Sequence, residues 1–279
     1  MSRVEIRTRS PFYLEKWFLD LVTDQGEAMI LYAAMLTWKG LKVPYTSCLH
    51  LKPGPAWKVH QQSRFRKVSM PERESNLITW QDEAFGITGV WEGLAAPVGA
   101  RLFDSDEGFL DWACYQPSAK VEIHKNGEQF RGEGYAERLI LTVPPWKIPM
   151  EDLRWGRFTS NGDYLVWIQL GGSNPGKWLW YNGDHVSRCS IADNRVTMQK
   201  PHMELEMKRI AELEGEKKIF NVVRDLTKFI PGFNQAMPLK FLMADEHKWL
   251  SKAILKSETG NLSSGFVIHE LVQFNGRRS

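Results

Sequence analysis

The sequence predicts an all-β protein of two consecutive antiparallel β-barrel domains, with one short helix late in the chain. Short strand-like runs recur at regular spacing between turn signals, which is typical of sandwiches and barrels and differs from alternating βα units. The length of 279 residues suits two domains of about 130–140 residues each. One signature also occurs twice, as Tyr13-Leu14-Glu15-Lys16 and as Tyr135-Ala136-Glu137-Arg138. We therefore interpret the chain as a duplicated barrel.

Clear turn signals separate the expected strands of the first half. Segments 12–22 and 28–38 flank Thr23-Asp24-Gln25-Gly26, which predicts a hairpin. Lys52-Pro53-Gly54-Pro55 then interrupts the strand pattern. The other expected strands are 43–51, 59–68, 76–80, 85–90, 98–103, 108–115 and 119–124. Links this short favour antiparallel pairing.

Asn126-Gly127 is the clearest internal boundary, so we expect one barrel over 1–126 and a second over 127–279. The strands expected beyond it are 129–141, 153–158, 164–170, 177–181, 186–191, 196–199, 203–210, 249–256 and 265–274. Apolar residues at helical spacing predict the short helix over 216–230. Pro231-Gly232 ends it.

Composition restricts the classes of partner. The chain is 43% hydrophobic and 25% charged, as in ordinary soluble globular proteins. Its 12 Trp and 14 Phe residues suit strands and ligand cavities. A net charge of +3 is too small to indicate nucleic acid as the main partner. No run approaches the roughly 18 apolar residues of a membrane span, so none is expected.

Metal catalysis has no support in the spacing of the ligand-forming residues. Cys48, Cys114 and Cys189 lie far apart, which indicates neither a zinc site nor a disulfide framework and favours a reduced, cytoplasmic location. The 7 histidines show no His-x-His or His-Glu-x-x-His spacing.

The two signatures contain the candidate acids. Residues i and i+2 of a strand share a face, so Tyr13, Glu15 and Trp17 lie together, and so do Tyr135 and Glu137. If these faces point into the barrels, desolvation raises the pKa of each carboxyl toward that of a useful general acid, and the phenol orients it or relays its proton. The alternative is that each carboxylate pairs with a basic neighbour and holds the barrels together.

Residues 153–158 form the densest mixture of aromatic and cationic side chains, in which Leu153, Trp155 and Arg157 share one strand face. The Arg157 guanidinium beside the Trp155 indole can hold a carboxylate or enolate oxygen of a substrate. It can equally form a salt bridge to Glu137 or Glu270. Both interpretations of Arg157 are compatible if that ion pair forms the floor of the pocket.

A stretch without acidic residues runs between Glu27 and Glu72. It contains Lys39, Lys42, Lys52, Lys58, Arg64, Arg66 and Lys67. Such a field can attract an anionic ligand, a membrane surface or an acidic carrier protein. The alternative is a set of solvated hairpin edges, where Lys and Arg discourage strand-to-strand association.

Several of these motifs resemble those of the paired lipocalin-like family that includes carotenoid hydratases of the hydroxyneurosporene synthase type, tocopherol cyclases and fungal Diels–Alder cyclases. Segment 15–20, Glu-Lys-Trp-Phe-Leu-Asp, is similar to that family's Glu-Trp-Trp-Tyr-Phe-Asp opening. Segment 132–137, Gly-Glu-Gly-Tyr-Ala-Glu, resembles its Gly-x-Gly-Tyr plus acidic element. The closing segment 265–270 continues the similarity.

This resemblance implies two lipocalin-like barrels packed side by side, a hydrophobic pocket for terpenoid or polyketide-like ligands, and no metal or organic cofactor. Members that do chemistry protonate an alkene or steer a cyclisation with an acidic or hydrogen-bonding group, and the matching position is Glu137. The hydratases continue the element with His, Asn and Trp, whereas this chain has Arg138, Leu139 and Ile140. That departure argues against carotenoid hydration, and Tyr-Ala-Glu-Arg is closer to the Tyr-Ala-Glu-Lys of tocopherol cyclases.

Three functions are consistent with these features. The first is a cyclase, isomerase or hydratase that acts on a hydrophobic unsaturated molecule, with Glu137 as proton donor and Tyr135 as its partner. The predicted substrate-binding residues are Trp155, Arg157, Trp17, Glu15 and Glu270. The second is a non-catalytic lipocalin-like carrier of a hydrophobic ligand. The third is an accessory protein that binds an acidic carrier protein through its basic stretch.

Overall fold

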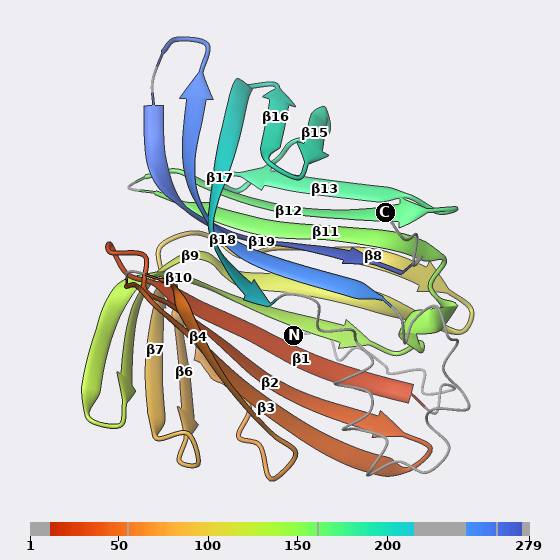
Figure 1. Cartoon of the computed structure of the whole chain (residues 1–279). Helices are drawn as coiled ribbons and strands as arrows, with labels where there is room; N and C mark the ends of the chain where they lie inside the picture. The colour runs from red at the N-terminus through yellow and green to blue at the C-terminus, as the bar shows by residue number, and fades with distance from the viewer. Residues whose placement is uncertain (1–11, 55, 161, 215–243, 261, 275–279) are drawn as a thin grey trace.

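The computed structural model describes residues 12–54, 56–160, 162–214, 244–260 and 262–274, which form two curled antiparallel sheets stacked one above the other (Figure 1). The first sheet has the strand order β4-β3-β2-β1-β10-β9-β7-β6-β5, and β8 also pairs with β9. Its strands are β1 (Phe12–Val22), β2 (Ala28–Trp38), β3 (Leu41–Lys52), β4 (Lys58–Arg64), β5 (Glu72–Glu74), β6 (Leu77–Asp82), β7 (Ile87–Gly93), β8 (Val98–Ser105), β9 (Gly108–Lys125) and β10 (Glu128–Leu141).

A single-turn 3₁₀ helix, Pro145–Lys147, leads into the second sheet. That sheet has the order β14-β13-β12-β11-β19-β18-β17-β16-β15. Its strands are β11 (Met150–Thr159), β12 (Tyr164–Gly172), β13 (Gly176–Tyr181), β14 (Asp184–His185), β15 (Cys189–Ala192), β16 (Arg195–Gln199), β17 (His202–Glu214), β18 (Asp245–Ser257) and β19 (Leu262–Gln273).

Both sheets have the same strand topology. In each, the first strand lies at the centre, the next three run out to one edge, and the last strand returns to pair with the first, as β10 does with β1 and β19 with β11. The all-β class and the two lipocalin-like units are therefore confirmed. The repeated Tyr-x-Glu signature does not reflect the repetition of this topology, because both copies lie in the first sheet, on β1 and β10.

The predicted domain division at 126/127 falls within a hairpin of the first sheet. β10 follows it directly and pairs with both β9 and β1. The chain changes sheets later, between Leu141 and Met150. The division into two independently folding domains at these boundaries remains a prediction. The helix predicted over 216–230 lies outside the described residues.

Most predicted strands are confirmed to within a few residues, but the break expected at 116–118 is wrong. Pro117 lies inside the continuous strand β9. It is tolerated there because the pairing with β10 shifts register at that point, passing from Gly134↔Ala119 to Ala136↔Gln116. A proline within a sheet needs such an irregularity, since it has no N–H to donate.

The apolar side chains divide into a core for each sheet and a third core between them. Trp17, Leu19, Trp80 and Trp91 belong to the core of the first sheet, and Trp167 belongs to that of the second. The core between the sheets combines residues from both, and its aromatic members include Phe18, Tyr32, Trp112, Tyr135, Trp155 and Trp180. Within the described part of the chain, no helix has the length and apolarity needed to cross a membrane.

Candidate functional site

The polar groups with the most perturbed environments lie where the two sheets face each other. In the first sheet, strand pairing places Tyr32, Phe18 and Glu137 in one transverse row, because Phe18 pairs with both of the others. The opposite row in the second sheet contains Trp155, Glu270 and Lys248. The rows touch: the rings of Phe18 and Trp155 are 4.9 Å apart, and Lys248 Nζ lies 2.6 Å from the Tyr32 hydroxyl.

Glu137 accepts hydrogen bonds from three aromatic side chains at one carboxylate oxygen, Oε2. The Tyr135 hydroxyl donates at 2.6 Å, the Trp155 indole N–H from the second sheet donates at 3.1 Å, and the Trp112 indole N–H donates as well. Tyr135, Trp112 and Trp155 are all buried, whereas Glu137 itself is half-buried. The predicted catalytic pair and Trp155 are thus brought together, and the acid keeps access from outside.

Regular alternation along β10 explains where this group points. The pairing with β9 shifts register on both sides of Ala136, but at each shift the extra residue lies on β9, and the pairing of β10 with β1 is continuous through Tyr135 and Glu137. Successive side chains of β10 therefore point to opposite faces. Ala136 points into the core of the first sheet, while Tyr135 belongs to the core between the sheets. The face carrying Tyr135 and Glu137 therefore points toward the second sheet and not, as the barrel interpretation assumed, into the first.

Burial controls the protonation of the pair. Desolvation raises the pKa of Glu137 above its ordinary value, although the hydrogen bonds from Tyr135 and Trp112 and the charge of Lys16 act in the opposite direction. Desolvation, with the nearby Cys114 and Glu137, raises the pKa of Tyr135 well above the ordinary phenol value. Tyr135 is therefore a hydrogen-bond donor at neutral pH, and Glu137 is a carboxyl that retains its proton to higher pH than an exposed glutamate.

Arg157 lies next to this group but is fully engaged elsewhere. Its Nε and Nη2 donate to the two oxygens of Asp20 at 2.9 and 2.6 Å, and its Nη1 donates to Thr159 at 3.1 Å. Both side chains are 0% exposed. The expected partners Glu137 and Glu270 are thus replaced by Asp20, and the pair joins β1 to β11 across the interface. Burial raises the pKa of Asp20 to about 6 against the opposing effect of Arg157.

Glu270 belongs to a second charged group, centred on the buried ammonium of Lys248. This ammonium lies 2.8 Å from Glu214, 3.1 Å from Glu270 and 3.7 Å from Glu246. Burial lowers the pKa of Lys248, but the surrounding carboxylates outweigh it and raise that pKa well above the ordinary value. Burial and the neighbouring Glu270 raise the pKa of Glu246 to about 8.

This charged group predicts a fall in stability between pH 4.5 and 8. Glu246 binds its proton more tightly in the folded chain, so its contribution is complete below the ordinary pKa of 4.5 and is lost as pH rises through about 8. We expect Glu246→Gln to remove about 1–3 kcal/mol of that pH-dependent change, after allowance for solvent screening. Urea unfolding of the parent and the variant at pH 5 and 8 measures it. Equal pH dependence in the two proteins contradicts this account.

The first Tyr-x-Glu copy lies on the opposite face of the same sheet. Glu15 accepts from Tyr13 at 3.4 Å and from the Trp17 indole at 3.3 Å, and Arg138 lies 3.8 Å away. Trp17 packs in the core of the first sheet. The structure therefore separates Glu15 and Trp17 from Glu137, and it supplies the basic neighbour of the alternative interpretation, Arg138.

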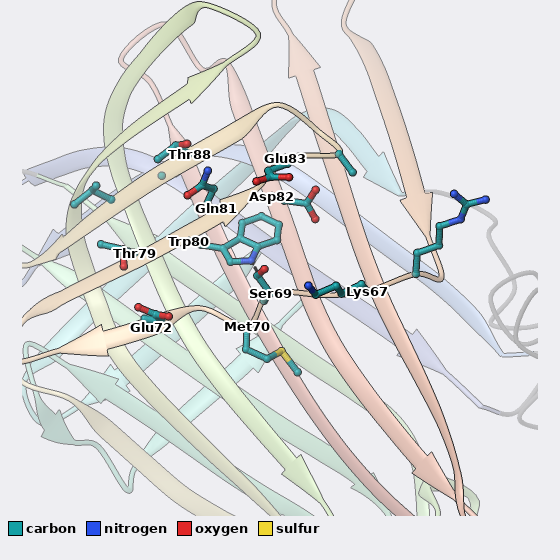
Figure 2. A pocket seen from close by; sticks show the side chains of 14 residues that line it. Lys67, Ser69, Met70, Glu72, Thr79, Trp80, Gln81, Asp82, Glu83 and Thr88 are labelled. Atoms are coloured by element: carbon teal, nitrogen blue, oxygen red, sulfur yellow. Dashed lines mark hydrogen bonds between the residues drawn. The ribbon is translucent and has the colours of Figure 1, made fainter.

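The Glu137 group does not line the open cavity of the first sheet, and the described residues contain no group placed to bind a metal ion. Among the described residues, no three His, Cys, Asp or Glu side chains are placed to hold a metal ion. A cavity of about 610 Å³ lies by β6 and β7, with Trp80 at its centre and Lys67, Met70 and Asp82 around it (Figure 2). None of the predicted site residues lines it.

Sequence reasoning missed Trp112, Asp20, Lys248 and Tyr32. Asp20 and Phe18 share a strand face. The register of β1 on β10 brings Phe18 to Glu137, and the packing of the sheets brings Asp20 to Arg157. Lys248 lies inside β18, just before the strand expected over 249–256, and the sequence carries no signal that distinguishes it from a solvated lysine.

Comparison with known proteins supports the fold. No protein-family profile matches the sequence, and no curated protein matches it at the level of sequence. Among solved structures, CghA superposes with a TM-score of 0.55 at 12% identity, over 96% of this chain and 90% of that chain. Kievitone hydratase from Nectria haematococca superposes with a TM-score of 0.53 at 11% identity, over 95% and 89% of the two chains.

A putative AttH from Nitrosomonas europaea superposes with a TM-score of 0.50 at 11% identity, over 92% of both chains. These similarities extend over both sheets, and identities this low establish the fold alone. The chain therefore has the two-sheet fold of the lipocalin-like cyclase and hydratase group, which confirms at the level of fold the resemblance of its strand motifs.

Proposed function

We propose that this protein is an enzyme that acts on a hydrophobic, unsaturated small molecule, terpenoid or polyketide-like, by acid–base chemistry without a cofactor. Glu137 is the proton donor, and the reaction is a cyclisation, isomerisation or hydration that begins with protonation of the substrate. The single observation that carries this proposal is a half-buried carboxyl of raised pKa whose one oxygen is held by three aromatic donors from two sheets.

The hydrogen bonds of Glu137 suit a general acid. Tyr135, Trp112 and Trp155 all donate to Oε2 and so hold the carboxyl in one orientation. These donors stabilise the carboxylate that forms when the proton leaves, while burial favours the protonated form beforehand. A carboxyl balanced in this way holds its proton before the reaction and is stabilised as the carboxylate after it, which is the property that general-acid catalysis needs.

The second candidate function is a non-catalytic carrier, for which the apolar core between the sheets would supply the binding surface. Incubating unsaturated terpenoids and polyketides with the protein, followed by chromatography with mass detection, distinguishes the two. An enzyme produces a new compound in amounts that exceed the protein, and a carrier returns its ligand unchanged. Kievitone hydratase shares this fold, which favours including kievitone in the screen.

We expect the pH–rate profile of the enzyme to have a plateau at low pH and to fall as pH rises through the raised pKa of Glu137, because the protonated carboxyl is the active form. The hydrogen bond from Tyr135 lowers that pKa, so Tyr135→Phe shifts the descending limb to higher pH. Initial rates across pH for both proteins measure the shift. A limb that stays in place or moves to lower pH contradicts the assignment.

The binding of an acidic carrier protein to the stretch without acidic residues between Glu27 and Glu72 remains a prediction. In the structure it includes β4, the exposed edge strand of the first sheet, where Lys52 pairs with Lys58. Charged residues on an edge strand also prevent association with other strands, so this placement is compatible with both interpretations.

A further inference from the structure

One cation at the interface has no role in the proposed reaction. Lys16 lies on β1 and pairs with Leu139, while Phe18 on the same face pairs with Glu137 and Tyr32. Lys16 is therefore a diagonal neighbour of both Glu137 and Tyr32, and such neighbours are within reach of a long side chain. Its ammonium lies 4.7 Å from the centre of the Tyr32 ring.

The hydrogen-bonding capacity of Lys16 is unused within the described part of the chain. The other two interface cations are occupied, since Arg157 donates to Asp20 and Thr159 and Lys248 donates to Tyr32 and Glu214. Lys16 is half-buried and makes the cation–π contact with Tyr32, and it forms no hydrogen bond or ion pair with another described residue. An ammonium has three N–H donors, so they are available to a ligand.

The surroundings of Lys16 favour a neutral oxygen over an anion. Leu14 shares a strand face with Lys16, and Leu139 pairs with it. Both leucines are partly buried and pack against the core between the sheets, so the ligand would meet apolar surface. Glu137 and Glu246 are both close enough to act electrostatically on Lys16. Burying a carboxylate ligand among the apolar side chains requires desolvation of a second charge, whereas a carbonyl oxygen gains a charge-assisted hydrogen bond without that cost.

We propose that Lys16 binds a carbonyl oxygen of the substrate, which makes the substrate class of the Glu137 site an unsaturated ketone or a related carbonyl compound. This proposal rests on the proposed function. Tyr32 and Glu137 lie on strands that flank β1, so they are separated by two strand spacings, about 10 Å. Lys16 lies on the strand between them, so one ligand can reach both the Lys16 ammonium and the Glu137 carboxyl. Lys16 is the residue that takes the role predicted for Arg157.

Equilibrium dialysis with chalcone and trans-stilbene tests this proposal. The two compounds are similar in shape and unsaturation, but only chalcone has a carbonyl group. We expect the parent to bind chalcone about tenfold more tightly than stilbene, as a hydrogen bond to a charged group implies. Lys16→Met should abolish the preference, and Lys16→Arg should retain most of it because the cation remains.

Lys39→Met is the matched control, because Lys39 also lies over an aromatic ring, Trp38 at 4.8 Å, but on an exposed hairpin. It should keep the tenfold preference. Equal binding of the two compounds by the parent, binding of neither, or an unchanged preference in Lys16→Met would overturn the proposal. Glu137→Gln should also keep the preference, so a failure of Glu137 as the acid is distinguishable from a failure of Lys16 as the anchor.

Discussion

Glu137→Gln is expected to lower turnover by a factor of about 10²–10⁴, the usual contribution of a positioned general acid. The amide has the same shape as the carboxyl, and its oxygen can still accept hydrogen bonds from Tyr135, Trp112 and Trp155. It cannot deliver the proton. Initial rates on a substrate found by the product screen measure the loss, and circular dichroism checks that the fold is kept.

The chain contains its own control for this experiment. Glu15 has the same Tyr-x-Glu context and also accepts hydrogen bonds from a Tyr and a Trp, but it lies on the opposite face of the sheet. Glu15→Gln should therefore leave the rate within about threefold of the parent, since a factor of three is less than 1 kcal/mol in the barrier. Glu137→Gln activity within that same range would remove Glu137 from the mechanism.

Breaking the ion pair between Asp20 and Arg157 should have the largest effect on stability. Both side chains are 0% exposed, so Asp20→Asn leaves the guanidinium without a counter-charge in the core between the sheets. Removing one partner of a buried pair typically costs about 3–5 kcal/mol. We expect this decrease in the free energy of unfolding, measured in urea at pH 7, for Asp20→Asn and for Arg157→Met.

A surface pair with similar geometry separates burial from pairing itself. Arg101 also donates to both oxygens of one carboxylate, that of Asp111, at 2.7 and 2.9 Å, but the side chains are 43% and 37% exposed. Asp111→Asn should change the free energy of unfolding by less than about 1 kcal/mol. The double variant Asp20→Asn with Arg157→Met should lose less than the sum of its single variants, because no charge is left unpaired. Full additivity, or equal decreases in the free energy of unfolding for Asp20→Asn and Asp111→Asn, contradicts a stabilising role for the buried ion pair.

Elements that depend on local pattern could be predicted from the sequence. The hairpin of β1 and β2 was predicted with its bounds, because two apolar strands flank a strong turn signal at Thr23-Asp24-Gln25-Gly26. The continuity of β9 through Pro117 could not be predicted. It depends on a register shift in the pairing of β9 with β10, and that shift is a property of the pair of strands.

The same distinction applies to the candidate site. Two-residue periodicity placed Tyr135 with Glu137, and Trp155 with Arg157, on shared strand faces, and the structure agrees in both cases. It could not reveal which way each face points. The two Tyr-x-Glu copies look equivalent in the sequence, yet one faces the core of the first sheet and the other faces the second sheet.

The strand content, the all-β class and the local pairing of phenol with carboxyl follow from the sequence alone, because they depend on neighbours within a few residues of each other. The pairing of Arg157 with Asp20, the cation–π contact of Lys16 and the contact of Glu137 with Trp155 follow from the packing of the two sheets. Those contacts depend on the register between strands and on how two sheets pack, and both are decided by the shape and burial of many side chains together.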